Sequence, residues 1–262
     1  MSQPVLAAQL YTIREHTQTV EDFAASMKKI REIGYTSVQV SAIGPIPHED
    51  VKRIVDDNGL TVCITHIGYD RLKDDIDGVI AQHKLWDAPN VAIGSMPNDF
   101  RVGGEDAYKR FAEFANGVGE KLYAAGLTFS YHNHSFEFVR FGDRTGLQLI
   151  YDETDPRYVQ AELDTYWVQH GGGDPAAWIE RMTNRMPVVH LKDMAVEVHE
   201  GEFHGQPIMA EVGEGNLNWP RVIEACKTAN VRWYAVEQDI CQRDPFESLA
   251  ISYRNLQAMG LR

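Results

Sequence analysis

The feature of this sequence that most constrains its fold is the regular alternation of short apolar stretches with longer stretches of helical periodicity. The apolar stretches have the length and composition of buried strands and cover residues 5–11, 36–40, 60–67, 90–93, 128–133, 159–163, 187–191 and 233–236. Helices are predicted between and after them, at residues 21–33, 48–58, 69–86, 105–125, 147–152, from 174 onwards, 219–227 and 244–259.

Eight strand–helix pairs in succession predict an α/β fold, a closed parallel (βα)8 TIM barrel that forms a single domain over residues 1–262. The 44% hydrophobic content supplies a full core, and no linker or low-complexity stretch divides the chain. An open doubly wound sheet is the competing architecture, because the number of strands alone does not prove closure. That sheet is disfavoured because no glycine-rich dinucleotide loop follows the first strand.

The net charge of −13 limits the partners of this chain. It leaves no basic face for nucleic acid or for an anionic membrane. The N-terminus does not read as a signal peptide, and no apolar run reaches the length of a membrane span. Three widely spaced cysteines, Cys63, Cys226 and Cys241, suit neither a disulfide framework nor a cysteine zinc site. We therefore expect a cytoplasmic protein that acts on a small molecule. The sequence does not decide between a monomer and a homo-oligomer.

The densest group of polar residues is Tyr131-His132-Asn133-His134-Ser135-Phe136-Glu137-Phe138, which directly follows an apolar strand. Alternate residues of a strand point to opposite faces, so His132 and His134 share one face. Placing two imidazoles and a carboxylate there costs desolvation free energy, which a bound divalent metal ion offsets. A single buried histidine more often only forms a hydrogen bond within a core. The density of polar groups here favours a functional site.

Polar residues also end the neighbouring predicted strands, where the active site of a TIM barrel lies. They are His66, Glu162, Asp164, His190, Lys192 and Glu237. Carboxylates and imidazoles without a thiolate suit Mn²⁺, Mg²⁺, Co²⁺ or Zn²⁺, so we predict one bound divalent metal ion. Any one of these residues taken alone could have a purely structural role. For example, Asp164 could cap a turn, Glu237 could pair with Arg232, and Lys192 could pair with Glu162.

In their order along the chain, these motifs resemble the xylose isomerase-like barrel superfamily of sugar isomerases and epimerases, in particular a branch with a His-Asn-His-x-x-Glu stretch. The resemblance covers nearly the whole chain. It rests on residues 131–138, Leu163-Asp164-Thr165-Tyr166-Trp167 leading to Asp174-Pro175, His190-Leu191-Lys192-Asp193, Glu211-Val212-Gly213-Glu214-Gly215, and Val236-Glu237-Gln238-Asp239 leading to Asp244-Pro245. The order of motifs is specific for the superfamily but not for a substrate.

The resemblance implies a divalent metal held by a carboxylate from the fifth strand, Asp from the sixth, His from the seventh and Glu from the eighth. Asp164, His190 and Glu237 match the last three positions. The fifth strand ends in His132, where many members have Glu. We therefore predict that Glu137 turns back to the metal with His132 beside it, and direct ligation by His132 is the alternative. His134 is then expected to face the substrate.

A metal ion chelated by a carbonyl oxygen and the adjacent hydroxyl of a sugar stabilises the charge that develops when the neighbouring carbon loses its proton. Reprotonation of the resulting enediolate gives an isomerase or epimerase, which is our first expectation. Loss of a β-hydroxyl gives a dehydratase acting on an inosose or keto-sugar, which is the alternative. The candidate bases are Glu237, Glu137 and His132, and Lys192 and His66 would steady the oxygens.

We expect the substrate to contact Trp167, Asn133 and Glu162. A phosphate-cradling loop or a cluster of basic residues does not stand out in the sequence, so an unphosphorylated sugar or cyclitol is favoured. A sugar-binding barrel without catalysis is a further interpretation from a different class. The complete set of acids, bases and ligands weakens it, because an idle cleft has no physical reason to keep so many costly polar groups.

Overall fold

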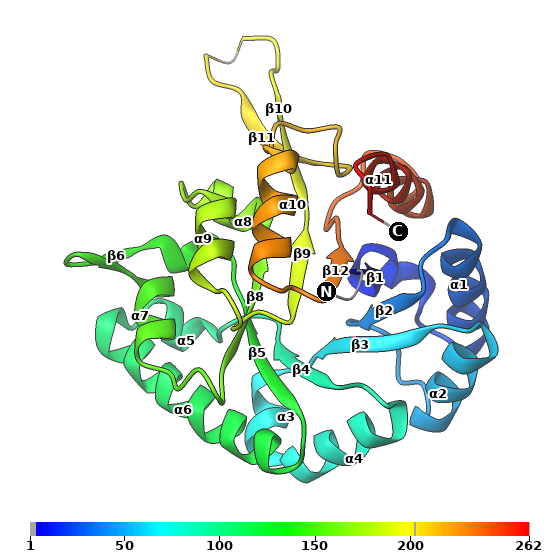
Figure 1. The fold of residues 1–262 in the computed structure, drawn as a ribbon, viewed down its shortest axis with the longest axis horizontal. Helices are drawn as coiled ribbons and strands as arrows, with labels where there is room; N and C mark the ends of the chain where they lie inside the picture. The colour runs from blue at the N-terminus through cyan, green and yellow to red at the C-terminus, as the bar shows by residue number, and fades with distance from the viewer. Residues whose placement is uncertain (1–3, 202, 262) are drawn as a thin grey trace.

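The computed structural model describes residues 4–201 and 203–261 and has a closed barrel of eight parallel strands at its centre (Figure 1). Around the barrel the strand order is β1-β12-β9-β8-β5-β4-β3-β2. The strands are β1 (Val5–Gln9), β2 (Ser37–Val40), β3 (Thr61–His66), β4 (Asn90–Ile93), β5 (Thr128–His132), β8 (Gln160–Asp164), β9 (Val188–Leu191) and β12 (Trp233–Val236). Each lies within or overlaps a predicted strand, and the predicted (βα)8 barrel is confirmed.

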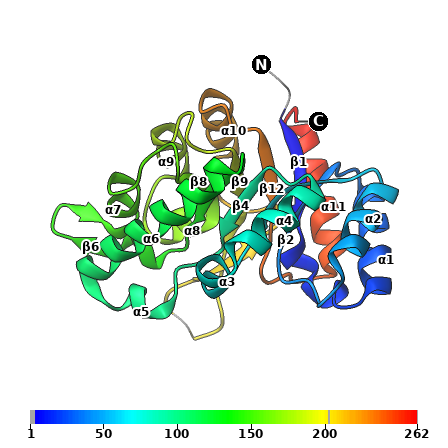
Figure 2. The same cartoon turned by 90° about the horizontal axis from the view of Figure 1, so that it is seen from below.

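Helices surround the barrel and cover its outer face (Figure 1). Figure 2 shows α1, α2 and α11 on one flank and α6, α7 and α9 on the other. The helices are α1 (Val20–Ile33), α2 (His48–Asp57), α3 (Tyr69–Asp74), α4 (Ile76–Trp86), α5 (Asn98–Arg101), α6 (Gly104–Ala124), α7 (Gly146–Asp152), α8 (Thr165–His170), α9 (Pro175–Arg181), α10 (Trp219–Thr228) and α11 (Pro245–Ala258). In the described part of the chain, none of the helices combines the length and the apolar composition that crossing a membrane requires.

The interior of the barrel changes from apolar to polar along the strands. A small apolar cluster on the barrel strands consists of Ala7, Cys63, Ile64, Ala92, Val188 and Ala235. Towards the ends of β1 and β9, and in β2 and β8, the residues Gln9, His190, Gln39 and Glu162 are fully buried. Buried polar groups need partners, so the polar end of the barrel must form a network of its own. This is the end at which a TIM barrel carries its active site.

Two predicted elements differ from the structure. The predicted helix over residues 69–86 is divided at Asp75 into α3 and α4, because the side chain of Asp75 accepts a hydrogen bond from Gly78 N at 3.2 Å and so caps α4. The predicted first strand ends at Gln9, and the chain continues as the 3₁₀ helix η1 (Leu10–His16). Both changes lie where the chain leaves a strand or starts a new helix.

The predicted long loop after the seventh barrel strand contains an antiparallel hairpin of β10 (Asp193–Glu197) and β11 (Gln206–Ala210). A second, two-residue hairpin, β6 (Arg140–Phe141) with β7 (Arg144–Thr145), follows the 3₁₀ turn η2 (Phe136–Phe138). In Figure 1 the β10–β11 hairpin projects beyond the ring of helices.

The buried carboxylate of Asp193 organises the base of this long hairpin. One oxygen accepts hydrogen bonds from Gly213 N at 2.9 Å and Gly215 N at 3.0 Å, and from the indole N–H of Trp219. The other oxygen accepts from Leu217 N at 3.2 Å. Several charge-assisted hydrogen bonds to one carboxylate hold the returning chain firmly. The segment after β11 is therefore fixed beside the end of β9.

His83, on α4, gives the fold a dependence on pH. It is fully buried, with Nδ1 2.7 Å from Val79 O and Nε2 2.7 Å from Thr65 Oγ1. Burial lowers the pKa of His83 from 6.5 to about 4, so the folded protein keeps the ring neutral where the unfolded chain takes up a proton. The free energy of unfolding should therefore fall as the pH drops from about 6.5 towards 4.

Comparison with His83→Met isolates this effect. The difference in free energy of unfolding between the wild type and His83→Met should decrease by on the order of 2–3 kcal/mol from neutral pH to about pH 4.5. Urea unfolding at a series of pH values measures it. A difference that does not change with pH would refute the assignment.

Candidate metal and substrate site

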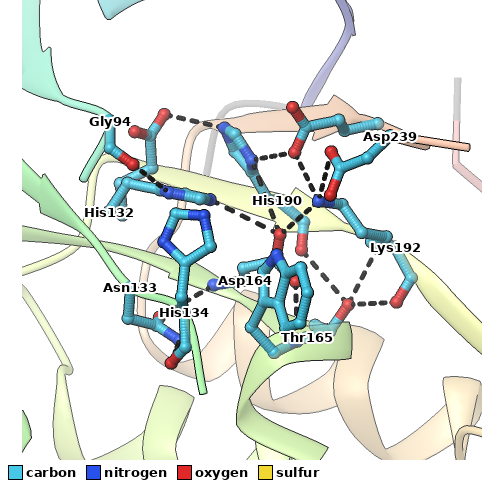
Figure 3. A network of polar contacts seen from close by, with 12 residues as sticks. Gly94, His132, Asn133, His134, Asp164, Thr165, His190, Lys192 and Asp239 are labelled. Carbon is cyan, nitrogen blue, oxygen red and sulfur yellow. Dashed lines mark hydrogen bonds and ion pairs between the residues drawn. The ribbon is translucent and has the colours of Figure 1, made fainter. Parts of the chain in front are cut away.

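Four buried side chains from four neighbouring strands converge at the polar end of the barrel (Figure 3). His132 ends β5, Asp164 ends β8, His190 lies in β9, and Glu237 directly follows β12. Asp164 stands opposite His190 in the register of β8 and β9, which brings the strand ends level. Each residue offers one ligand atom, and these atoms lie within 4.8 Å of one another.

The ring of His132 is oriented by a backbone carbonyl. Its Nδ1 lies 2.9 Å from Gly94 O, and its Nε2 lies 3.4 Å from Asp164 Oδ2. A carbonyl oxygen can only accept, so the ring donates from Nδ1 to Gly94 O, and Nε2 is the nitrogen that faces Asp164.

The ring of His190 is held in the same manner by side chains. Its Nε2 lies 3.0 Å from Glu162 Oε1 and 2.8 Å from Gln39 Oε1, while its Nδ1 lies 2.9 Å from Glu237 Oε2. Burial alone would lower the pKa of His190, but the carboxylates of Glu162 and Glu237 outweigh it and raise the pKa to about 10. Binding of a metal ion at Nδ1 must therefore release a proton.

Glu162 links His190 to a third histidine, His66. Besides His190, its carboxylate binds His66 Nε2 at 2.8 Å, and Glu162 itself is fully buried. Burial acts to raise the pKa of this carboxyl, but His190 and His66 hold it well below its usual range. Glu162 is therefore a charged partner that orients imidazoles, as the carboxylate does in carboxylate–histidine–metal arrangements.

Lys192 places an ammonium group against the same carboxylates. Its Nζ lies 3.0 Å from Asp164 Oδ2, 2.7 Å from Glu237 Oε2 and 3.0 Å from Asp239 Oδ1 (Figure 3), and the side chain is 1% exposed. The sequence reasoning assigned no role to Asp239. The signal was present, because Asp239 follows Glu237 by two residues, just as Lys192 follows His190 by two.

These donors suit a divalent metal ion. Two carboxylate oxygens and two imidazole nitrogens face one point, and each imidazole has its other nitrogen held by an oxygen acceptor. That combination of hard oxygen and borderline nitrogen ligands with oriented rings is typical of sites for Mn²⁺, Co²⁺, Zn²⁺ and related ions. The buried His/Asp/Glu cluster could therefore bind a metal ion, with Lys192 as a neighbouring cation.

Glu137 does not belong to this cluster. Its Oε1 accepts a hydrogen bond from the hydroxyl of Tyr131 at 2.6 Å, and both of its oxygens lie within 3.0 Å of His134 N. Tyr131 packs against Phe111 of α6, on the helix side of β5. Because side chains alternate along a strand, this is the side opposite His132. In this structure His132, the alternative, lies with Asp164, His190 and Glu237, and Glu137 lies apart from them; which of the two ligates a metal ion stays a prediction.

Substitutions at Glu137 test this placement. Glu137→Gln should leave the metal content of the protein unchanged, since the side chain lies outside the cluster. Glu137→Ala should lower the free energy of unfolding by on the order of 2–4 kcal/mol, because it leaves Tyr131 and His134 N without their buried acceptor. Elemental analysis and urea unfolding measure the two effects. Loss of metal from a fully folded Glu137→Gln protein would contradict the placement of Glu137 outside the cluster.

A cavity of about 440 Å³ opens over the cluster and is called the central cavity here. Among its walls are His66, His132, His134, Lys192, Glu237 and Asp239. The structure therefore brings five predicted catalytic residues to one cavity and leaves Glu137 out. Burial lowers the pKa of His134 to about 3, so this ring is neutral at physiological pH.

The three predicted substrate-binding residues lie behind these walls. Asn133 accepts from Asp164 N at 3.1 Å and donates to His134 O at 3.2 Å, so it fixes the backbone around both. Trp167 N donates to Asp164 Oδ1 at 2.9 Å, and its indole packs on His134 with 5.3 Å between ring centroids. Together with Glu162, they support the cavity residues, and direct contact with a substrate stays a prediction.

Comparison with known proteins gives the family. The sequence model of xylose isomerase-like TIM barrels matches residues 27–243. Inosose dehydratase of Geobacillus thermodenitrificans is 28% identical over 155 residues, which cover 55% of this chain and 51% of the relative. The chain thus matches about half the length of the curated relatives.

Solved structures support the fold. A sugar phosphate isomerase/epimerase from Parabacteroides distasonis superposes with a TM-score of 0.79 at 24% identity, over 98% of this chain and 95% of the other. A probable 3-DHS dehydratase from Bacillus anthracis superposes with a TM-score of 0.73 at 11% identity, over 97% and 98%. Since the family model spans most of the sequence and the closed barrel agrees with it, the chain belongs to the family of xylose isomerase-like TIM barrels.

Proposed function

We propose that this protein is a divalent-metal-dependent enzyme that removes a proton from the carbon next to the carbonyl of an unphosphorylated sugar or cyclitol. The observation that carries the proposal is the convergence of His132, Asp164, His190 and Glu237 on one point, with the outer nitrogens of both rings held by oxygen acceptors. Costly buried charges of this kind cluster at functional sites.

These four residues are the proposed ligands of the metal ion. When bound, the ion supplies Lewis-acid stabilisation of the negative charge that develops on the substrate oxygens. We infer Mn²⁺, Mg²⁺, Co²⁺ or Zn²⁺ from the mixture of carboxylate and imidazole ligands.

The remaining chemistry belongs to the walls of the central cavity. Glu237 is the proposed base, because it is a buried carboxylate at the cavity, whereas Glu137 is enclosed by Tyr131 and His134 N. The ammonium of Lys192 would stabilise charge on an enediolate oxygen. His66 and His134 would orient substrate hydroxyls by hydrogen bonds.

The charge of the cavity supports an unphosphorylated substrate. In the described part of the chain, Lys192 is the single lysine or arginine of the cavity wall, and its ammonium already contacts three carboxylates. A phosphate dianion would meet Asp239 and Glu237 without a free cation to balance it. A neutral polyhydroxylated ring avoids this repulsion.

The first candidate reaction is isomerisation or epimerisation, in which the abstracted proton returns to the other carbon or to the opposite face. The second candidate is dehydration of an inosose or keto-sugar, and the inosose dehydratases among the sequence relatives favour it. Dehydration needs a proton for the departing β-hydroxyl, so that a C–H bond and a C–O bond break and water leaves. Lys192 and Asp239 are the proposed donors of that proton.

One experiment distinguishes these fates. The manganese-loaded protein is incubated with a panel of ketoses and inososes in deuterated water and followed by proton NMR and ultraviolet absorbance. Incorporation of deuterium next to the carbonyl with a new sugar supports the isomerase or epimerase. A growing enone absorbance supports the dehydratase. Binding of a sugar without exchange or absorbance would overturn both and leave a non-catalytic sugar-binding barrel.

A further inference from the structure

We propose that the substrate carries a second hydroxyl-bearing ring, joined to the sugar, which binds in a separate cavity at the rim of the barrel. This inference rests on the proposed function and extends its substrate from a single ring to a glycoside or disaccharide. The second cavity has a volume of about 260 Å³ and is called the rim cavity. Its walls include Ser41, Ala42, His66, Arg71, Gln82 and Trp86.

The rim cavity adjoins the central cavity. Ser41, His66 and Ile67 belong to the walls of both. His66 ends β3, with its Nε2 bonded to Glu162 on the inner side of the barrel, whereas Gln82 and Trp86 come from α4 on the outer side. A group attached to a sugar in the central cavity can therefore extend over the end of β3 towards α4.

Gln82, in the wall of the rim cavity, carries a buried hydrogen-bond acceptor without a partner in the described part of the chain. Gln82 is 5% exposed, and its side-chain oxygen Oε1 has no hydrogen-bond partner among the described residues. The next residue, His83, has both ring nitrogens bonded. A buried amide oxygen without a partner costs about 1–3 kcal/mol, so its retention beside a cavity points to a ligand that donates a hydrogen bond.

The backbone around the rim cavity is held in a strained conformation. Ala42 has φ of +54°, in the left-handed region that residues other than glycine rarely adopt. Its carbonyl accepts a hydrogen bond from Gln18 Nε2 at 3.0 Å, and Gly44 N donates to Thr17 O at 2.9 Å. A Cβ on Gly44 would lie 1.9 Å from Gln18 O, so this loop requires glycine there. Backbone strain of this kind collects at binding sites.

The chemistry of the walls favours an uncharged, hydroxylated group. Arg71 already forms an ion pair with Asp75 at 3.4 Å, so its charge is balanced. The indole N–H of Trp86 donates to His48 O at 2.9 Å and is also in use. The acceptor oxygen of Gln82 has no partner among the described residues, and a sugar hydroxyl is a donor that fits it.

Fluorine NMR on protein labelled with 5-fluorotryptophan can follow both cavities in one experiment. Trp86 reports on the rim cavity and Trp167, packed on His134, reports on the central cavity. Their signals are assigned with Trp86→Phe and Trp167→Phe. The probes are fructose and three disaccharides that contain it as the ketose ring, namely lactulose, turanose and isomaltulose.

We expect fructose to shift the Trp167 signal only, and at least one disaccharide to shift both signals and to bind at least fivefold more tightly than fructose. Gln82→Met should abolish the Trp86 shift and the gain in affinity while leaving fructose binding unchanged. The variant should fold normally, because Gln82 Oε1 loses no hydrogen bond. Gln257→Met, on the exposed side of α11, is the matched control and should behave as the wild type.

Two results would overturn the inference alone: disaccharides that shift Trp167 but never Trp86, or a disaccharide gain that survives Gln82→Met. In both cases sugar binding at the central cavity would still support the proposed function. If neither signal responds to any of the four sugars while metal is bound, the extended substrate fails, and the panel of ketoses and inososes then decides the proposed function separately.

Discussion

His190→Ala is expected to lower the affinity for a divalent metal ion by at least about a thousandfold and to abolish proton exchange. The substitution removes one of the four proposed ligands and the imidazole that connects Glu162 to Glu237. Elemental analysis of protein purified without chelators and reloaded with Mn²⁺ should give about one metal ion per wild-type chain and none in the variant. Titration calorimetry gives the affinities.

His190→Ala also leaves the buried charge of Glu162 with one partner fewer, which destabilises the fold. A second variant is therefore needed to separate loss of metal from misfolding. The ring of His132 bonds otherwise to the carbonyl of Gly94, so His132→Ala disturbs the fold less. It should still weaken metal binding by about ten- to a hundredfold. Full metal content in both folded variants would refute the site.

Lys192→Met should bind the metal ion about ten- to a hundredfold more tightly than the wild type, yet lose most of its activity. The ammonium lies within 3.0 Å of the same oxygens of Asp164 and Glu237 that face the proposed metal position, so it repels the ion. Unit charges about 4 Å apart repel each other by about 4 kcal/mol at an effective dielectric constant near 20. Removing only a part of this repulsion is enough for the expected gain in metal affinity. Activity falls because no cation then stabilises the enediolate.

Thermal unfolding provides an independent measure of the same competition. Without metal, Lys192→Met leaves three carboxylates, including Asp239, without their shared ammonium and should melt at a lower temperature than the wild type. Added Mn²⁺ should then raise its melting temperature by more than it raises that of the wild type. Lys28→Met, at an exposed position of α1, should change neither property. Weaker metal binding by Lys192→Met would mean that the ammonium supports the site.

Much of the architecture could be predicted because it follows from periodicity. The barrel strands are short stretches in which apolar residues follow one another or alternate with polar ones, and Asp174 and Asp244, each followed by proline, cap α9 and α11 as expected. The break at Asp75 and the β10–β11 hairpin escaped prediction. The break coincides with the cap that Asp75 forms, and several hydrogen bonds to Asp193 hold the base of the hairpin; a hydrophobic pattern encodes neither.

The site follows the same rule. Asp164, His190 and Glu237 lie in or next to strands, where alternation fixes which way a side chain points, and they converge as expected. Glu137 lies five residues beyond the end of β5, in the turn η2, where the loop backbone sets the direction. The hydroxyl of Tyr131 and the backbone N–H of His134 donate hydrogen bonds to it and hold it apart from the His132, Asp164, His190 and Glu237 cluster, and spacing alone does not reveal which donors a loop carboxylate meets.

The hydrogen bonds of Asp193 fix the base of the projecting β10–β11 hairpin beside the candidate site. Its carboxylate ties Gly213, Gly215 and Leu217 directly next to Lys192, so the position of the ammonium does not depend on residues farther out along β10 and β11. The outer hairpin can therefore be lengthened, shortened or replaced while the barrel mouth keeps its shape. For protein engineering, this makes the hairpin a natural insertion point where a reporter or a binding module can be placed close to the candidate metal and substrate site.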